Sequence, residues 1–97
     1  MAKAKTADEK RHLNKVASLG CIACSNMGYE DSPAEIHHIR GGQGLKRASH
    51  YEAIPLCPTH HRTGGYGMAF HAGKVAWEQE FGTERELLDQ VLGLINA

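Results

Sequence analysis

The amino-acid sequence predicts one small α+β domain, in which a β-hairpin stapled by metal-ligand residues is flanked by N- and C-terminal helices. The chain has 97 residues, too few for a second domain with its own core. Helical periodicity is confined to its two ends, and two short apolar segments lie between them. Paired cysteine and histidine residues bracket those segments, as expected where a small core needs a staple.

An N-terminal helix is expected over residues 6–19, and residues 1–17 form the N-terminal part of the predicted domain. Thr6 and Glu9 have the spacing of a capping box, in which each side chain accepts a hydrogen bond from the other residue's backbone. Gly20 follows the last apolar position, where a helix commonly ends on a glycine.

The central part, residues 18–71, is predicted to hold the hairpin. Residues 35–39 and 51–56 are the strand candidates, because both are short and apolar-rich. A glycine-rich turn at 41–44 lies in the long connection between them. The glycines at 64–67 argue against a long continuous helix after the second strand.

The C-terminal part, residues 72–97, is predicted to be helical. A short helix is expected over 73–81, followed by a longer one that starts at a second capping box, Thr83 and Glu86. Its apolar side chains recur with helical spacing and are assigned to the core. They are Leu87, Leu88, Val91, Leu92 and Ile95.

The three cysteines predict a structural zinc site. Cys21-x2-Cys24 and Cys57-x2-His60 are two pairs with the spacing that lets one turn offer two ligands to a tetrahedral ion. Together they use every cysteine of the chain, and an odd cysteine number argues against a disulfide framework. The alternative is that the cysteines are small buried hydrophobic residues without a metal.

Six of the seven histidines lie between residues 37 and 71. If the two pairs share one zinc ion, His61 is held near the strand that carries His37, and His71 is a candidate third ligand of a second, solvent-open metal site. Such a site acts as a Lewis acid on a phosphoryl group. His38 is then available as a neutral general base. The alternative is that these histidines are ordinary hydrogen-bonded residues.

Charge and hydropathy bound the function classes. The net charge is zero, but residues 1–62 carry nine Lys/Arg against six Asp/Glu, whereas residues 63–97 carry two against five. This distribution fits either one basic face or ordinary surface charge. No apolar run approaches the roughly 18 residues of a membrane span. The N-terminal residues have no apolar segment typical of a secretory signal, so a cytoplasmic location is expected.

These motifs in this order resemble the zinc-stapled HNH endonucleases, whose core is the ββα-metal or treble-clef unit. The matching segments are Cys21-x2-Cys24, Ile36-His37-His38-Ile39, Gly41-Gly42 and Ile54-Pro55-Leu56-Cys57-x2-His60-His61. The continuation His71-Ala72-Gly73-x3-Trp77-x3-Phe81-Gly82-Thr83 is similar to the phage recombination-enhancing HNH nuclease group. The resemblance covers about residues 18–85.

The resemblance implies roles for individual residues. His37 and His61 match the ligands of the catalytic metal, which is Mg²⁺ or another divalent ion, and His38 matches the general base. His71 is assigned as a further ligand, although it follows His61 at a longer spacing than is usual in the family. The family's middle asparagine is replaced here by Glu52, which bears on loop geometry more than on metal chemistry.

The sequence and this resemblance together predict a metal-dependent DNA endonuclease of phage or prophage origin, in the cytoplasm of a bacterial host cell. The resemblance also implies recombinase-coated DNA as a partner. Basic residues around the hairpin loop are expected to contact backbone phosphates without sequence preference. They are Arg40, Lys46, Arg47 and Arg62. The rival is a non-catalytic zinc module that binds nucleic acid or a recombinase, which would need the zinc ligands but not the other histidines. A third interpretation is a protein-interaction domain that uses the apolar stripe of the last helix. The core is expected to bury that apolar face, which argues against this interpretation.

Overall fold

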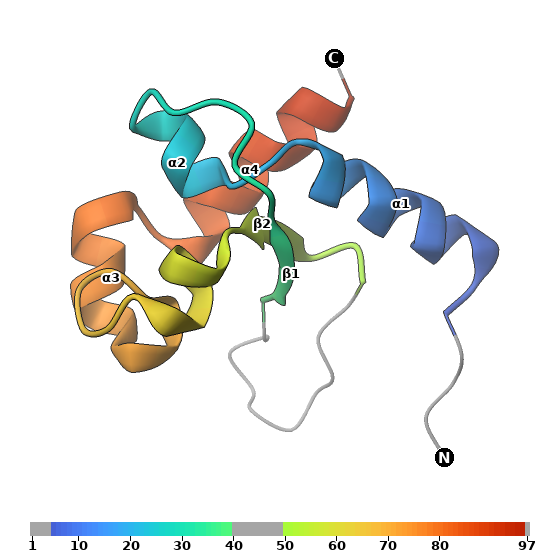
Figure 1. The fold of residues 1–97 in the computed structure, drawn as a ribbon. Coiled ribbons are helices and arrows are strands. Elements are labelled where there is room, and N and C mark those ends of the chain that lie inside the picture. The colour runs from blue at the N-terminus through green and yellow to red at the C-terminus, as the bar shows by residue number, and fades with distance from the viewer. Residues whose placement is uncertain (1–4, 40–49, 97) are drawn as a thin grey trace.

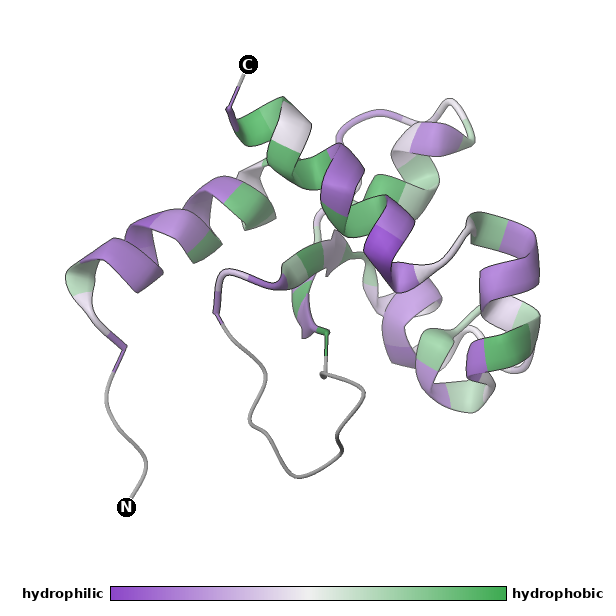
Figure 2. Ribbon diagram, turned by 180° about the vertical axis from the view of Figure 1, so that it is seen from behind, coloured by the Kyte–Doolittle hydropathy of each residue, from purple (hydrophilic) through white to green (hydrophobic). Residues whose placement is uncertain are grey.

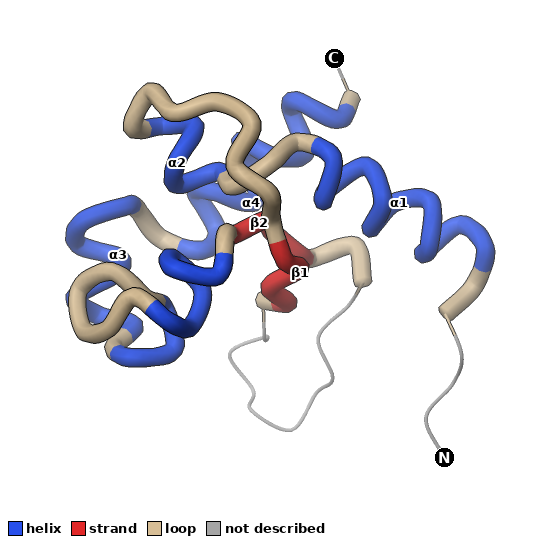
Figure 3. Tube along the Cα trace, viewed as in Figure 1, coloured by secondary structure: helices blue, strands red, loops and turns tan. Residues whose placement is uncertain are grey.

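A two-stranded antiparallel sheet lies at the centre of the computed structural model, with helices around it (Figures 1 and 3). The structure describes residues 5–39 and 50–96. Its helices and strands confirm the predicted α+β class. In chain order the elements are α1 (Ala7–Ser18), α2 (Ile22–Asn26), β1 (Glu35–His38), β2 (Ala53–Leu56), the π-helical turn η1 (Thr59–Thr63), the 3₁₀ turn η2 (Phe70–Ala72), α3 (Lys74–Phe81) and α4 (Glu84–Ile95).

Both predicted capping boxes are present. At the start of α1 the Thr6 hydroxyl accepts the Glu9 backbone N–H at 3.1 Å, and the Glu9 carboxylate accepts the Thr6 N–H at 2.8 Å. Thr83 and Glu86 make the same pair of bonds at the start of α4, at 3.1 and 2.9 Å. Gly20 follows α1 with a φ of +75°, a conformation that glycine adopts without strain.

The register of the hairpin decides which way its histidines point. His37 pairs with Ile54 and His38 with Ala53. Successive residues of a strand face opposite sides of the sheet, so these two histidines project from opposite faces of β1. Glu35, two residues before His37, shares its face. His37 and His38 therefore lie in different environments, although they are adjacent in the sequence.

The core forms around β2, whose four residues are all buried. Helices α1, α2 and α4 all contact this strand. Figure 2 shows hydrophilic colour over most of α1, with apolar bands at a few positions, whereas apolar and polar residues alternate along α4. The predicted stripe of α4 joins the core, with Leu87, Leu88 and Val91 buried and Leu92 and Ile95 packed against them. The apolar face of α4 is therefore occupied within the domain.

The chain after β2 makes two turns before it becomes regularly helical again. The turn η1 carries two adjacent histidines and ends at Gly64, whose N–H bonds to the Thr59 carbonyl at 3.0 Å. Since η1 ends at Thr63 and the next element starts at Phe70, the prediction that no long helix follows the second strand is confirmed. None of the helices in 5–39 and 50–96 has the length and apolar character that crossing a membrane requires.

Candidate metal centres

The first candidate centre is the cysteine cluster, which consists of Cys21, Cys24, Cys57 and His60. Cys21 precedes α2, and its sulfur accepts the backbone N–H of Cys24 at 3.4 Å, so the first pair forms the beginning of a short helix. Cys57 follows β2 directly, and His60 belongs to η1. The cluster therefore joins α2 to the end of the hairpin, as the spacing of the two pairs predicts.

The distances within the cysteine cluster match those of a tetrahedral zinc site. The Nδ1 atom of His60 lies 3.5, 3.4 and 3.2 Å from the sulfurs of Cys21, Cys24 and Cys57. The sulfurs of Cys24 and Cys57 are 3.8 Å apart, far beyond a disulfide bond. Usual Zn–S and Zn–N bond lengths in a tetrahedron give about 3.8 Å between sulfurs and about 3.5 Å between sulfur and nitrogen.

Burial shifts the pKa of two groups of this cluster. It raises the pKa of the Cys21 thiol to about 12 and lowers the pKa of His60, so both groups favour their neutral forms. A neutral imidazole is the form that binds a metal, whereas a thiol must first lose its proton. The donor set of three sulfurs and one nitrogen fits zinc, and a divalent cation at its centre would stabilise the thiolates.

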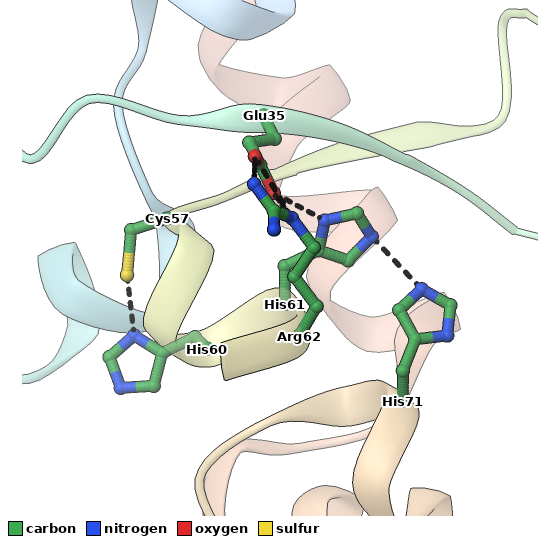
Figure 4. A network of polar contacts seen from close by, with 6 residues as sticks. All are labelled: Glu35, Cys57, His60, His61, Arg62 and His71. Carbon is green, nitrogen blue, oxygen red and sulfur yellow. Dashed lines mark hydrogen bonds and ion pairs between the residues drawn. The ribbon is translucent and has the colours of Figure 1, made fainter. Parts of the chain in front are cut away.

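The second candidate centre is the histidine cluster of His37, His61 and His71, each of which offers a nitrogen within 4.8 Å of the others. These residues come from β1, η1 and η2. The Nε2 atoms of His61 and His71 face each other at 3.0 Å, as the close view shows (Figure 4). His37 is buried, His61 half-buried and His71 exposed, so the cluster opens to solvent on one side.

The two clusters therefore differ in coordination capacity. The cysteine cluster supplies four ligands and closes a tetrahedron, which is typical of a structural zinc site. The histidine cluster supplies three ligands and has an exposed side, which is typical of a site where a metal also binds water or substrate. Residues 60 and 61 are adjacent in the sequence and belong to different clusters.

Two carboxylates that the sequence did not predict accept hydrogen bonds from histidines of the cluster. The Nε2 atom of His37 lies 2.7 Å from Glu84 at the start of α4, and the Nδ1 atom of His61 lies 2.8 Å from Glu35 on β1. The alternation of a strand is the signal that could have identified Glu35, since it shares a face with His37. Glu84 is 47 residues from His37, and no local pattern links them.

Both carboxylates are ionised. The bidentate ion pair with Arg62 and the hydrogen bond from His61 lower the pKa of Glu35 to about 2. Burial pushes the pKa of Glu84 upward, but the hydrogen bond from His37 and the charge of Lys74 outweigh it, and the pKa lies below its ordinary value. An ionised carboxylate accepts hydrogen bonds only, so each neighbouring histidine is the donor.

Of the four residues predicted to contact DNA phosphates, the structure describes only Arg62. The Arg62 guanidinium is engaged by Glu35 at 2.6 to 3.2 Å (Figure 4), and its role toward DNA stays a prediction. Arg40, Lys46 and Arg47 lie outside the described residues.

His38 lies apart from the histidine cluster. Its Nε2 atom is 3.0 Å from the Nδ1 atom of His50, on the face of β1 opposite His37. Burial, followed by the charges of His50, Lys5 and His37, lowers the pKa of His38, so the imidazole is neutral near pH 7. A neutral imidazole is the form that a general base requires.

Comparison with known proteins adds one finding. A family model described as "Recombination enhancement, RecA-dependent nuclease" matches residues 5–96. The matched region contains both clusters, the hairpin and all of the helices described above.

Proposed function

This chain belongs to the family of recombination-enhancing, RecA-dependent nucleases, and on that basis we propose that it is a metal-dependent DNA endonuclease of the HNH type. The observation that carries the proposal is the histidine cluster, in which three imidazoles converge beside solvent. A module that only bound DNA or RecA would need the cysteine cluster for its fold, but it would have no use for a second, open set of ligands.

In this proposal the cysteine cluster holds zinc and has a structural role. It ties α2 to the chain that follows β2, and so fixes the turn η1 against the hairpin. That turn carries His61, so the staple also sets the position of one ligand of the histidine cluster. The arrangement of a hairpin, a staple and a histidine-bearing turn is what the ββα-metal unit requires, and it supports a treble-clef-like core.

The histidine cluster holds the catalytic divalent ion through His37, His61 and His71. When bound, the ion supplies Lewis-acid chemistry, neutralising charge on a phosphate and on the leaving oxygen. Three imidazoles leave the choice among first-row ions wide, and Mg²⁺ with waters is also compatible. The exposed side next to His71 is where a DNA phosphate would approach.

His38 acts as the general base in this proposal and removes a proton from the attacking water. Because it faces away from His37, the scissile phosphate must lie across the end of β1 to meet both the base and the ion. The contact at 3.0 Å with His50 orients the His38 ring. The proposal thus needs DNA to approach this end of β1. The predicted phosphate contacts Arg40, Lys46 and Arg47 follow β1 in the sequence, outside the described residues.

The substrate follows from the family. RecA dependence makes DNA coated by a RecA filament the substrate to test first, with basic side chains binding the phosphate backbone irrespective of sequence. The alternative, a non-catalytic zinc module, predicts binding to the same DNA with no strand cleavage under any metal condition.

The test is a cleavage assay on plasmid and on RecA-coated DNA with Mg²⁺ or Mn²⁺, run beside a melting curve for each variant. His38→Ala should leave the fold and DNA affinity intact and slow cleavage by about 10²–10⁴-fold, the usual contribution of a positioned base. His61→Ala should reduce cleavage through loss of the ion, with partial rescue by excess metal.

His60, the neighbour of His61, provides the matched control for the His61→Ala variant. His60→Ala changes the same turn by the same substitution, but it should lower the melting temperature because it opens the cysteine cluster. If His38→Ala cleaves at the wild-type rate, the base assignment is wrong. If the wild-type protein binds RecA-coated DNA and cuts none with any divalent ion, the binding module is the better account.

A further inference from the structure

The histidine cluster is supported by a second layer of residues. Glu84 lies behind His37, with its carboxylate 2.7 Å from Nε2, and Glu35 lies behind His61, with its carboxylate 2.8 Å from Nδ1. The two carboxylates come from different elements, one from the first turn of α4 and the other from β1. In His61 the contacted nitrogen is not the one that faces His71, and in His37 the contact with Glu84 occupies Nε2.

These contacts fix the tautomer of each ring. A neutral imidazole carries one N–H, and a carboxylate partner draws that hydrogen to the nitrogen beside it. His37 is therefore protonated on Nε2, and its lone pair is on Nδ1. His61 is protonated on Nδ1, and its lone pair is on Nε2, the atom that lies 3.0 Å from Nε2 of His71. The two tautomers are opposite, and each is determined by its own glutamate.

The two glutamates are themselves held in place. Glu84 is only 8% exposed, its backbone N–H donates to Glu78 at 3.0 Å, and its second carboxylate oxygen lies 3.6 Å from the Lys74 ammonium. It is also the first residue of α4, where the helix dipole favours a negative charge. Glu35 is fixed by the guanidinium of Arg62. Each glutamate is therefore held by contacts of its own while it accepts a hydrogen bond from a histidine of the cluster, and this arrangement restricts rotation of the ring.

We propose that Glu84 and Glu35 are positioning residues that orient His37 and His61 and select the tautomers that present Nδ1 and Nε2 to a divalent ion. The inference rests on the proposed function for the catalytic use of that ion, but not for its binding. Carboxylates in such positions raise the basicity of the ligand and restrict rotation of its ring. Neither glutamate touches the substrate in this account.

The experiment uses the full chain with zinc in the cysteine cluster, and titrates Mn²⁺ while free Mn²⁺ is followed by electron paramagnetic resonance. Glu84→Ala and Glu35→Ala should each weaken Mn²⁺ binding by about 10–100-fold. Glu84→Gln keeps an acceptor and the packing but loses the charge, so it should weaken binding less than Glu84→Ala. Glu80→Gln, an exposed carboxylate on α3, is the control and should bind as wild type.

A second readout reports the tautomers without any ion at the histidine cluster. Ring ¹⁵N shifts of the zinc-loaded protein above pH 7 should show His61 protonated on Nδ1, the minor tautomer of a free histidine side chain. Glu35→Ala should return His61 to the Nε2–H form and leave His37 unchanged. Glu35 is partly exposed, so this variant tests the idea even if Glu84→Ala does not fold.

The outcomes separate this inference from the proposed function. Wild-type Mn²⁺ affinity in both alanine variants, or an Nε2–H tautomer for His61 in the wild-type protein, would overturn it. Lower melting temperatures with unchanged Mn²⁺ affinity would overturn it as well, because the glutamates would then be structural only. Weakened binding together with an absence of DNA cleavage would support it and defeat the nuclease mechanism.

Discussion

Replacing Cys57 by serine should unfold the domain. Cys57 is the least buried of the three cysteines, so the substitution changes the packing little and tests the ligand itself. Its sulfur lies 3.2 Å from Nδ1 of His60 and 3.8 Å from the sulfur of Cys24, the spacing of ligands around one ion. A serine hydroxyl is a poor zinc ligand and would leave the tetrahedron incomplete.

Two magnitudes decide how severe the loss should be. A domain of 97 residues has a net stability of about 5–15 kcal/mol at the usual value per residue. Binding of structural zinc contributes about 10–16 kcal/mol in small zinc domains near neutral pH. The metal term equals or exceeds the net stability, so its loss should convert the folded protein to an unfolded one rather than lower its melting temperature slightly.

The assay is elemental analysis beside circular dichroism. The wild-type protein should carry one zinc ion per chain in the cysteine cluster, unfold in excess EDTA and refold when zinc is restored. Cys57→Ser should contain no zinc and should lack a cooperative melting transition. A wild-type protein that contains no zinc and still melts cooperatively would refute the reasoning, because the fold would then be stable with the four side chains of the cluster unliganded.

Two further predictions concern the base and the turn that carries the ligands. Burial lowers the pKa of His38 below its ordinary value of 6.5, so the imidazole stays neutral to a lower pH. The acid limb of kcat/KM against pH should therefore have its midpoint below pH 6.5. A midpoint at or above pH 6.5 would contradict the assignment of His38 as the base. Gly64→Ala would bring a Cβ within 2.5 Å of the Thr59 carbonyl oxygen, so η1 must shift. We expect a loss of about 1–3 kcal/mol in urea unfolding and weaker metal binding at both clusters. Gly93→Ala, at an exposed position of α4 with open space, should instead raise the free energy of unfolding by about 0.5–1 kcal/mol and leave metal binding unchanged.

The ends of the fold were predictable because their signals are local. A capping box spans four residues, so Thr6 with Glu9 and Thr83 with Glu86 can be identified without knowledge of tertiary contacts. The spacing of the cysteine pairs is also a short-range pattern, and it predicts a cluster that the structure assembles. The helical form of the segment after Cys21 was not predicted, because a sulfur that caps a five-residue helix has no distinct sequence signature.

The support of the histidine cluster was not predictable in the same way. Glu84 meets His37 across 47 residues, and in the sequence it is an ordinary acidic residue in the first turn of a helix. Arg62 is a basic residue of the kind that contacts phosphates, but in the fold its guanidinium pairs with Glu35. Both cases depend on how α4 and η1 pack on the hairpin, and only tertiary structure supplies that information.

The most direct test of the central claim is to measure ion binding and DNA cleavage in the same titration. Mn²⁺ is added to zinc-loaded protein on RecA-coated DNA, and both occupancy of the histidine cluster and the cleavage rate are followed. The account predicts that the two curves coincide and that His61→Ala shifts both to higher Mn²⁺ concentration. Full cleavage before the cluster is occupied, or cleavage by His61→Ala at the wild-type rate and Mn²⁺ dependence, would contradict it.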